Sequence, residues 1–283
     1  MKGWRWRYVP PNLLTCTSLV VALFSISESI ARDFKTAAWM LVLCVLLDKA
    51  DGFTARLFKA SSRFGVELDS LADLIAFGVA PAVFVLSLLL GEGLSKGLEN
   101  MPEYRRLIYV GCFFYVVAAA LRLAKFNVMT EEYGHSHFFG IPTTLCGGVI
   151  GCYFLTVERY GLPAEFIRFL PGLMIILGLL MVSRLPLPKF VLGKSPIRKF
   201  LAVANVIGVY FCGIVRVYPE YLLVLTVTYI TVGTLWCLAK GVKPPVRKAP
   251  DLSVEKEESD KAEDELQEEE EDPEAEAHWE DHF

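Results

Sequence analysis

The sequence of residues 37–90 is AAWMLVLCVLLDKADGFTARLFKASSRFGVELDSLADLIAFGVAPAVFVLSLLL, with two apolar runs on either side of a charged segment. The first run ends after eleven residues, and Asp48 follows directly. Eleven residues cannot cross a bilayer, because a transmembrane helix needs about 20. We therefore expect this helix to continue to about Leu57, which places carboxylates at or inside one membrane interface.

Four aspartates lie where these two runs meet the charged segment. Asp48 and Asp51 are three residues apart, and Asp69 and Asp73 are four residues apart. Each pair shares one face of its helix, so two consecutive antiparallel helices can bring the four carboxylates together. Ionisable groups at such positions are costly and indicate a function. Oxygen-only ligands favour hard cations, here Mg²⁺ or Mn²⁺, with Ca²⁺ as an inhibitor or substitute.

The composition predicts an all-α integral membrane protein. Hydrophobic residues make up 54% of the 283 and charged residues 21%, with a mean hydropathy of +0.43, which excludes an ordinary soluble globule. Runs near the length of a membrane span predict a polytopic bundle of six to eight transmembrane helices. The candidate spans are 12–31, 37–57, 66–90, 107–127, 141–157, 166–184, 199–217 and 219–240.

The distribution of Lys and Arg predicts the orientation of these spans. With the N-terminus inside, the cytoplasmic segments hold 18 Lys and Arg outside the acidic tail, and the opposite side holds 8. Positive residues accumulate on the cytoplasmic side of membrane proteins. We therefore predict a multi-pass protein of the cytoplasmic (inner) membrane, with both termini and the four aspartates on the cytoplasmic side.

Charge also divides the chain into two parts. Residues 250–283 hold 17 of the 32 acids and carry a net charge of −15, whereas the remainder carries +11. We predict a membrane-embedded domain over 1–242 and an acidic, disordered cytoplasmic tail over 243–283, with a solubilising or lipid-repelling role. The basic body indicates anionic partners such as lipid headgroups or phosphates. We expect no nucleic-acid partner.

The aspartates belong to a longer motif that resembles the signature of the CDP-alcohol phosphatidyltransferases. That signature is D-x2-D-G-x2-A-R-x8-G-x3-D-x3-D, and every fixed position is matched, by Asp48, Asp51, Gly52, Ala55, Arg56, Gly65, Asp69 and Asp73. Further segments resemble the phosphatidylserine synthase branch of the family. These are PNLLT (11–15), SSRFGVELDSLADLIAFGVAPA (61–82), LRLAKFNV (121–128), FGIPTT (139–144) and LMVSRLPLPKF (180–190). The resemblance covers most of residues 8–200.

This resemblance implies a reaction and its partners. The protein would transfer the phosphatidyl group of CDP-diacylglycerol to the hydroxyl of L-serine, giving phosphatidylserine and CMP in phospholipid biosynthesis. It would act among membrane lipids as a homodimer with two divalent ions. By motif position, Asp48, Asp51 and Asp69 would be metal ligands, and Asp73 the catalytic base and a further ligand. The nucleotide would be bound by Gly52, Ala55, Arg56 and Gly65, although small residues also serve close helix packing.

A serine substrate also needs a group that binds its carboxylate. The basic residues near the same interface are Arg122, Lys125 and Arg184, with Asn127 as an additional amide donor. The alternative for these cations is anchoring to lipid headgroups under the positive-inside rule.

Other functions remain open at the level of the sequence. A sibling enzyme could use glycerol phosphate or inositol phosphate as acceptor, or an archaeal-type ether-lipid donor. A cation transporter could also place carboxylates in the membrane, although its site would lie nearer the midplane at an interrupted helix. A prenyltransferase would need a second Asp-rich site. Alternatively, the four acids could pair with Arg56, Lys59 and Arg63.

Overall fold

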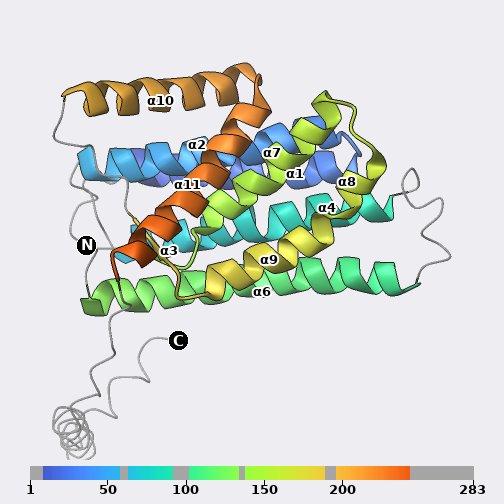
Figure 1. Cartoon of the computed structure of the whole chain (residues 1–283), viewed down its shortest axis with the longest axis horizontal. Helices are drawn as coiled ribbons and strands as arrows, with labels where there is room; N and C mark the ends of the chain where they lie inside the picture. Colours follow the sequence, from blue (N-terminus) through green and yellow to red (C-terminus); the bar gives the residue numbers. More distant parts are fainter. Residues whose placement is uncertain (1–8, 58–62, 92–101, 134–137, 189–195, 243–283) are drawn as a thin grey trace, which may run out of the picture. The chain divides into compact units, whose positions relative to one another are not determined.

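The computed structural model describes residues 9–57, 63–91, 102–133, 138–188 and 196–242 (Figure 1). The elements in chain order are α1 (Val9–Ile30), α2 (Phe34–Leu57), α3 (Arg63–Asp73), the π-helix η2 (Leu74–Val79), α4 (Ala80–Leu90), α6 (Pro102–Tyr133), β1 (Phe138–Phe139), α7 (Thr143–Arg159), α8 (Ala164–Arg168), α9 (Leu170–Val182), β2 (Pro186–Leu187), α10 (Pro196–Val215) and α11 (Pro219–Ala239). The predicted tail, 243–283, lies outside the described residues.

Helices occupy all eight predicted positions, which confirms an all-α membrane fold. Within the described ranges, five helical stretches are long and apolar enough to cross a membrane: Asn12–Ile30, Phe64–Leu90, Pro102–Val128, Ala164–Val182 and Pro219–Ala239. Charged residues lower the hydropathy of α2, and α7 has only 17 residues. The protein is therefore a multi-pass membrane protein, whereas the total of six to eight spans and the side of the termini stay predictions.

Helices α1 and α2 form a tightly packed hairpin. Ala22 and Ala37 are fully buried, and the Ser25 hydroxyl donates to the Ala37 carbonyl at 2.9 Å. The Asp33 carboxylate caps α2 by accepting the Thr36 backbone N–H at 3.0 Å, and this hydrogen bond lowers the pKa of the Asp33 carboxyl. These contacts fix the position of α1 along α2, the helix that carries Asp48 and Asp51.

Helix α7 lies inside the bundle and packs against α2, η2 and α11. Its glycines allow this close approach, because a Cβ added at Gly151 would lie 3.1 Å from the Ala38 carbonyl oxygen on α2. Beside this contact, the rings of Phe34, Phe84 and Phe154 meet edge to face with centroids 5.1 to 6.4 Å apart. This aromatic core stabilises the end of the bundle that lies opposite the aspartates.

A short antiparallel strand pair, absent from the sequence predictions, joins two loops that are distant in sequence. Phe138 pairs with Leu187 and Phe139 with Pro186. Gly140 follows with φ of +82°, and a Cβ there would overlap the Met181 carbonyl oxygen, so this position requires glycine. The pair ties the FGIPTT segment to the LPLPKF segment at the start of α7.

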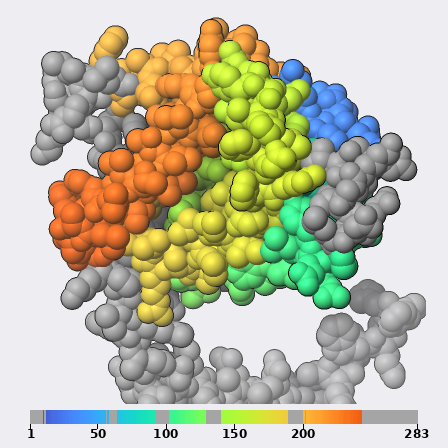
Figure 2. Space-filling model, turned by 45° about the vertical axis from the view of Figure 1, so that its right-hand side comes forward, coloured from blue at the N-terminus to red at the C-terminus, as the bar shows by residue number. Residues whose placement is uncertain are grey.

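The last two helices lie on the outside of the bundle. Figure 2 shows α11, in orange to red, on the surface beside α7, in yellow-green. Large apolar side chains on α10 and α11 are exposed, among them Ile207, Val224 and Leu235. An apolar outer surface is what a helix facing lipid presents, since lipid tails are as apolar as these side chains.

Candidate active site

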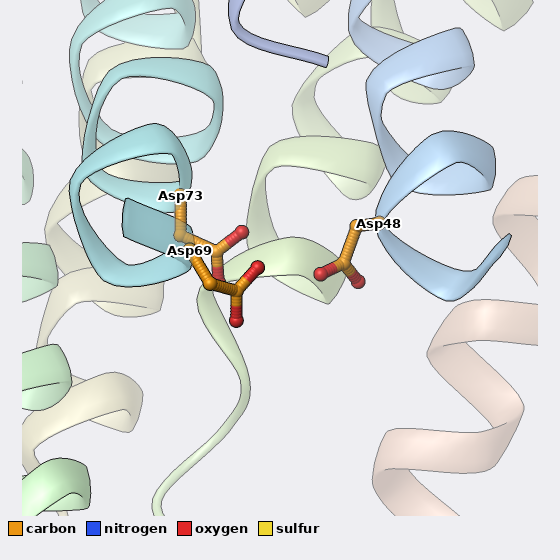
Figure 3. A group of neighbouring side chains, drawn as sticks. All are labelled: Asp48, Asp69 and Asp73. Atoms are coloured by element: carbon orange, nitrogen blue, oxygen red, sulfur yellow. The ribbon is translucent and has the colours of Figure 1, made fainter. Parts of the chain in front are cut away.

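Three carboxylates meet between α2 and α3. Asp48 projects from α2, and Asp69 and Asp73 project from α3 toward it (Figure 3). One oxygen atom from each carboxylate lies within 4.8 Å of the other two. The four-residue spacing on α3 puts its two aspartates on one face, as the sequence predicts. We call these three residues the Asp cluster.

The Asp cluster carries more negative charge than its neighbours balance. The Lys49 ammonium pairs with Asp48 Oδ2 at 2.7 Å, and it is the one ion pair of the cluster among the described residues. The Asp48 side chain is 13% exposed and that of Lys49 is 55% exposed, so the lysine approaches from the solvent side. Carboxylate oxygens at this separation, with one lysine among them, fit a hard divalent cation.

Asp51 lies outside this group of three. It is buried one turn after Asp48, and it accepts a hydrogen bond from the Thr15 hydroxyl on α1. Oxygen atoms of three of the four predicted aspartates thus lie within 4.8 Å of one another, and the fourth is held against α1, close enough to Asp48 and Asp69 to interact with both electrostatically. Thr15 belongs to the PNLLT segment, but sequence reasoning assigns it no role, because its partner is 36 residues away.

The small residues of the motif lie on the exposed side of α2 and α3. A Cβ added at Gly52 would meet no atom within 4 Å, so close helix packing does not explain this glycine in the described structure. Ala55 and Gly65 are half-buried. The side chain of Arg56 lies outside the described part of the chain. Open space beside Gly52 leaves room for a flat group against the helix.

Arg122 reaches the Asp cluster from α6. Its side chain is buried, and it lies close enough to Asp73 and Asp48 to interact with both electrostatically. Its Nε atom has no hydrogen-bond partner among the described residues, and the same is true of the buried Thr143 hydroxyl at the start of α7. A buried charge with an unused donor is costly unless a partner binds there.

The other predicted acceptor residues form a second group. Lys125 is half-buried and lies near the exposed Arg184, with which it interacts electrostatically. The Asn127 amide donates to the Ser70 hydroxyl at 2.9 Å, which ties α6 to α3 beside Asp69. The structure thus brings Arg122 to the Asp cluster, places Lys125 near Arg184, and gives Asn127 a protein partner. The role of Ser70 has no signal in the sequence.

Comparison with known proteins identifies the family. A model described as CDP-alcohol phosphatidyltransferase matches residues 8–183, which include the whole Asp cluster. The chain belongs to the CDP-alcohol phosphatidyltransferase family. Members of this family generally depend on divalent metal ions, and the three carboxylates can bind one.

Two of the relatives of this phosphatidyltransferase share a name, and a third is named for a related serine lipid. A Helicobacter pylori protein named CDP-diacylglycerol–serine O-phosphatidyltransferase is 33% identical over 238 residues, covering 83% of this chain and 94% of its own. A Mycobacterium bovis protein of the same name is 29% identical over 76% of this chain and 72% of its own. The archaetidylserine synthase of Methanothermobacter thermautotrophicus is 32% identical over 63% of this chain and 69% of its own. The resemblance to the family and to its phosphatidylserine synthase branch is confirmed.

One contact links this phosphatidyltransferase site to a helix beyond the family match. The Tyr210 hydroxyl on α10 donates to the Leu46 carbonyl oxygen at 3.1 Å, two residues before Asp48. A Cβ at Gly213 would press on the Leu46 side chain, so α10 packs directly on this part of α2. Helix α10 therefore supports α2 where the Asp cluster begins.

Proposed function

We propose that this protein is a phosphatidylserine synthase, which transfers the phosphatidyl group of CDP-diacylglycerol to the hydroxyl of L-serine and releases CMP. The observation that carries this proposal is the Asp cluster, because the family signature supplies all three carboxylates from two helices. Relatives named for the serine reaction over most of the chain support serine as the acceptor.

The proposed cofactor is a pair of divalent ions, Mg²⁺ or Mn²⁺, with Asp48, Asp51, Asp69 and Asp73 as ligands. When bound, such ions neutralise charge on the pyrophosphate and on the CMP leaving group. The Thr15 hydroxyl donates to Oδ2 of Asp51, which leaves Oδ1 and the second lone pair of Oδ2 for an ion. Lys49 would have to release Asp48 or share it when an ion binds.

Asp73 is the proposed catalytic base. The serine hydroxyl oxygen would attack the phosphorus that carries diacylglycerol, while the bond from that phosphorus to the CMP oxygen breaks. The hydroxyl proton would pass to the Asp73 carboxylate, and CMP would leave with the bonding electron pair. The half-buried side chain of Asp73, directed toward Asp48 and beside Arg122, supports this role.

The nucleotide of the donor would lie along the exposed side of α2 and α3. We assign Gly52, Ala55 and Gly65 to the surface beside the cytidine, since the space at Gly52 is open. Arg56 is assigned to the nucleotide phosphates by its motif position. This arrangement would leave the acyl chains of the donor in the bilayer.

The carboxylate of serine would bind at Arg122. The guanidinium is buried beside Asp73, so an acceptor bound there would have its hydroxyl near the proposed base. The Thr143 hydroxyl and the N-terminal end of α7 are further donors for an anion. Lys125 and Arg184 would contribute positive charge at the entrance, because Arg184 is exposed.

We place the site at the cytoplasmic face of the inner membrane, with both termini in the cytoplasm, on the basis of the Lys and Arg distribution. The proposed assembly is a homodimer, as the family resemblance implies. The acidic segment 243–283 is proposed as a cytoplasmic tail that takes no part in the chemistry.

A second candidate is synthesis of the ether lipid archaetidylserine. The 32% identity to an archaetidylserine synthase favours it, and it differs only in the lipid part of the donor. The four aspartates and Arg122 would keep the same roles, because the pyrophosphate and the serine are common to both reactions.

A panel of donors and acceptors tests both candidates. Purified protein in detergent is given CDP-diacylglycerol or CDP-archaeol, each with serine, glycerol phosphate or inositol phosphate, and both CMP and the lipid product are measured. We expect CMP and phosphatidylserine in equal amounts with CDP-diacylglycerol and serine, and none with the Asp48→Asn variant. Turnover with glycerol phosphate or inositol phosphate but not serine would refute the serine assignment.

A further inference from the structure

We infer that the π-helical turn after Asp73, held by Pro81 and the Tyr115 hydroxyl, aims the α3 carboxylates at Asp48, and that Tyr115 is a positioning residue for the metal site. The inference rests on the proposed metal site. Helix α3 ends at Asp73, η2 begins at the next residue, and the helix continues without a break into α4. The turn therefore lies between the carboxylates and the rest of their helix.

Pro81 explains why the helix widens here. In an α-helix the Phe77 carbonyl would accept the N–H of residue 81, but proline has none and its ring crowds that carbonyl. The chain instead forms a π-type hydrogen bond, in which the Ala80 N–H donates to the carbonyl oxygen of Ile75, five residues earlier. The π-turn is thus the local response to proline inside an apolar helix.

Tyr115 supplies the donor that the proline lacks. Its hydroxyl, fully buried on α6, donates to the Phe77 carbonyl oxygen at 2.8 Å. A carbonyl without a partner at this depth would be costly. The Tyr115 bond therefore stabilises the π-turn relative to backbone arrangements that move the Phe77 carbonyl out of reach of this hydroxyl. Gly147 on α7 lets the turn lie close, because a Cβ there would lie 3.3 Å from the Phe77 Cα atom.

The turn sets the rotation of α3 relative to α4. A π-turn accommodates one extra residue, and one residue of an α-helix corresponds to a rotation of about 100°. Helix α4 is fixed by buried side chains such as Phe84, Val85 and Leu89. If the turn became α-helical while α4 stayed in place, Asp69 and Asp73 would rotate away from Asp48. The geometry of the Asp cluster therefore depends on a bond made outside it.

The test measures Mn²⁺ binding to the purified full-length protein by electron paramagnetic resonance, together with thermal unfolding in EDTA. The variant Tyr115→Phe removes only the hydroxyl, and Tyr104→Phe is the matched control. The Tyr104 hydroxyl on the same helix also donates to a backbone carbonyl, that of Arg168, at 2.8 Å. We expect Tyr115→Phe to weaken Mn²⁺ binding by about tenfold, the low end of the effect of losing a group bonded to a metal ligand, because Tyr115 acts on the ligands through the turn. We expect Tyr104→Phe to leave Mn²⁺ binding unchanged.

Pro81→Ala gives a second test that does not depend on a destabilised variant. It restores an N–H opposite the Phe77 carbonyl, so it should leave the unfolding temperature in EDTA equal or higher while Mn²⁺ binding weakens. Wild-type Mn²⁺ affinity in Pro81→Ala, or equal losses in Tyr115→Phe and Tyr104→Phe, would overturn the inference. A wild-type protein that binds no Mn²⁺ would instead overturn the proposed metal site itself.

Discussion

Asp48 and Asp73 are both proposed metal ligands, but only Asp73 is also assigned as the catalytic base. Asp48→Asn should weaken metal binding and with it nucleotide binding, because an amide lacks the charge that balances a divalent cation. Asp73→Asn should spare binding of CDP-diacylglycerol but lower transfer to serine by about 10²- to 10⁴-fold, the usual effect of losing a general base. The measurements are nucleotide affinity and turnover for each variant.

Two results would reassign Asp73. Near wild-type turnover of Asp73→Asn with serine would show that the base lies elsewhere. A loss of nucleotide affinity as large as that of Asp48→Asn would show that Asp73 is chiefly a metal ligand.

A single substitution at Arg122 tests how the acceptor is recognised. Arg122→Gln should raise the KM for serine by at least about tenfold, the equivalent of one charged hydrogen bond, with little change in the KM for CDP-diacylglycerol. Arg105→Gln is the control, since Arg105 is exposed on the same helix and has no proposed role at the site. Serine methyl ester lacks the carboxylate, so wild-type protein should prefer serine and Arg122→Gln should lose that preference. An unchanged preference would exclude Arg122 from the acceptor site.

At the scale of elements, the sequence predicts the helices well because long apolar runs must be buried or face lipid. It does not predict η2, because Pro81 lies in a uniformly apolar run and its compensating partner Tyr115 is on another helix. It does not predict the β1–β2 pair, because two residues are too short for a strand pattern. The hydrogen bond that Asp51 accepts likewise comes from a distant residue, Thr15 on α1.

Packing between α6 and α9 can be tested away from the site. A Cβ at Gly111 would lie 2.8 Å from the Pro171 carbonyl oxygen, so Gly111→Ala should separate the helices and lower the free energy of unfolding by about 1–3 kcal/mol. The added methyl group of Gly172→Ala meets no atom of the described residues within 4 Å, so this variant should change the free energy of unfolding by less than about 0.5 kcal/mol. Thermal unfolding in one detergent measures both, and equal stability of the two variants would contradict this packing.

The acidic segment 243–283 is predicted to be dispensable for the chemistry. The proposed catalytic and metal-binding residues lie on α2, α3 and α6, all within 1–242. Deletion from Asp251 onward should therefore leave turnover in the same detergent within about tenfold, or 1.4 kcal/mol of barrier, of the full chain. A larger loss would show that the tail contributes to binding or catalysis.

The Asp cluster is proposed to use divalent ions to transfer a phosphatidyl group to serine. The most direct test follows CMP released from CDP-diacylglycerol by the purified full-length protein, with and without serine, in EDTA and then with added Mg²⁺ or Mn²⁺. We predict release that requires serine, stops in EDTA and returns with either ion, together with one phosphatidylserine per CMP. Undiminished turnover in excess EDTA, or CMP release that is independent of serine, would contradict the claim.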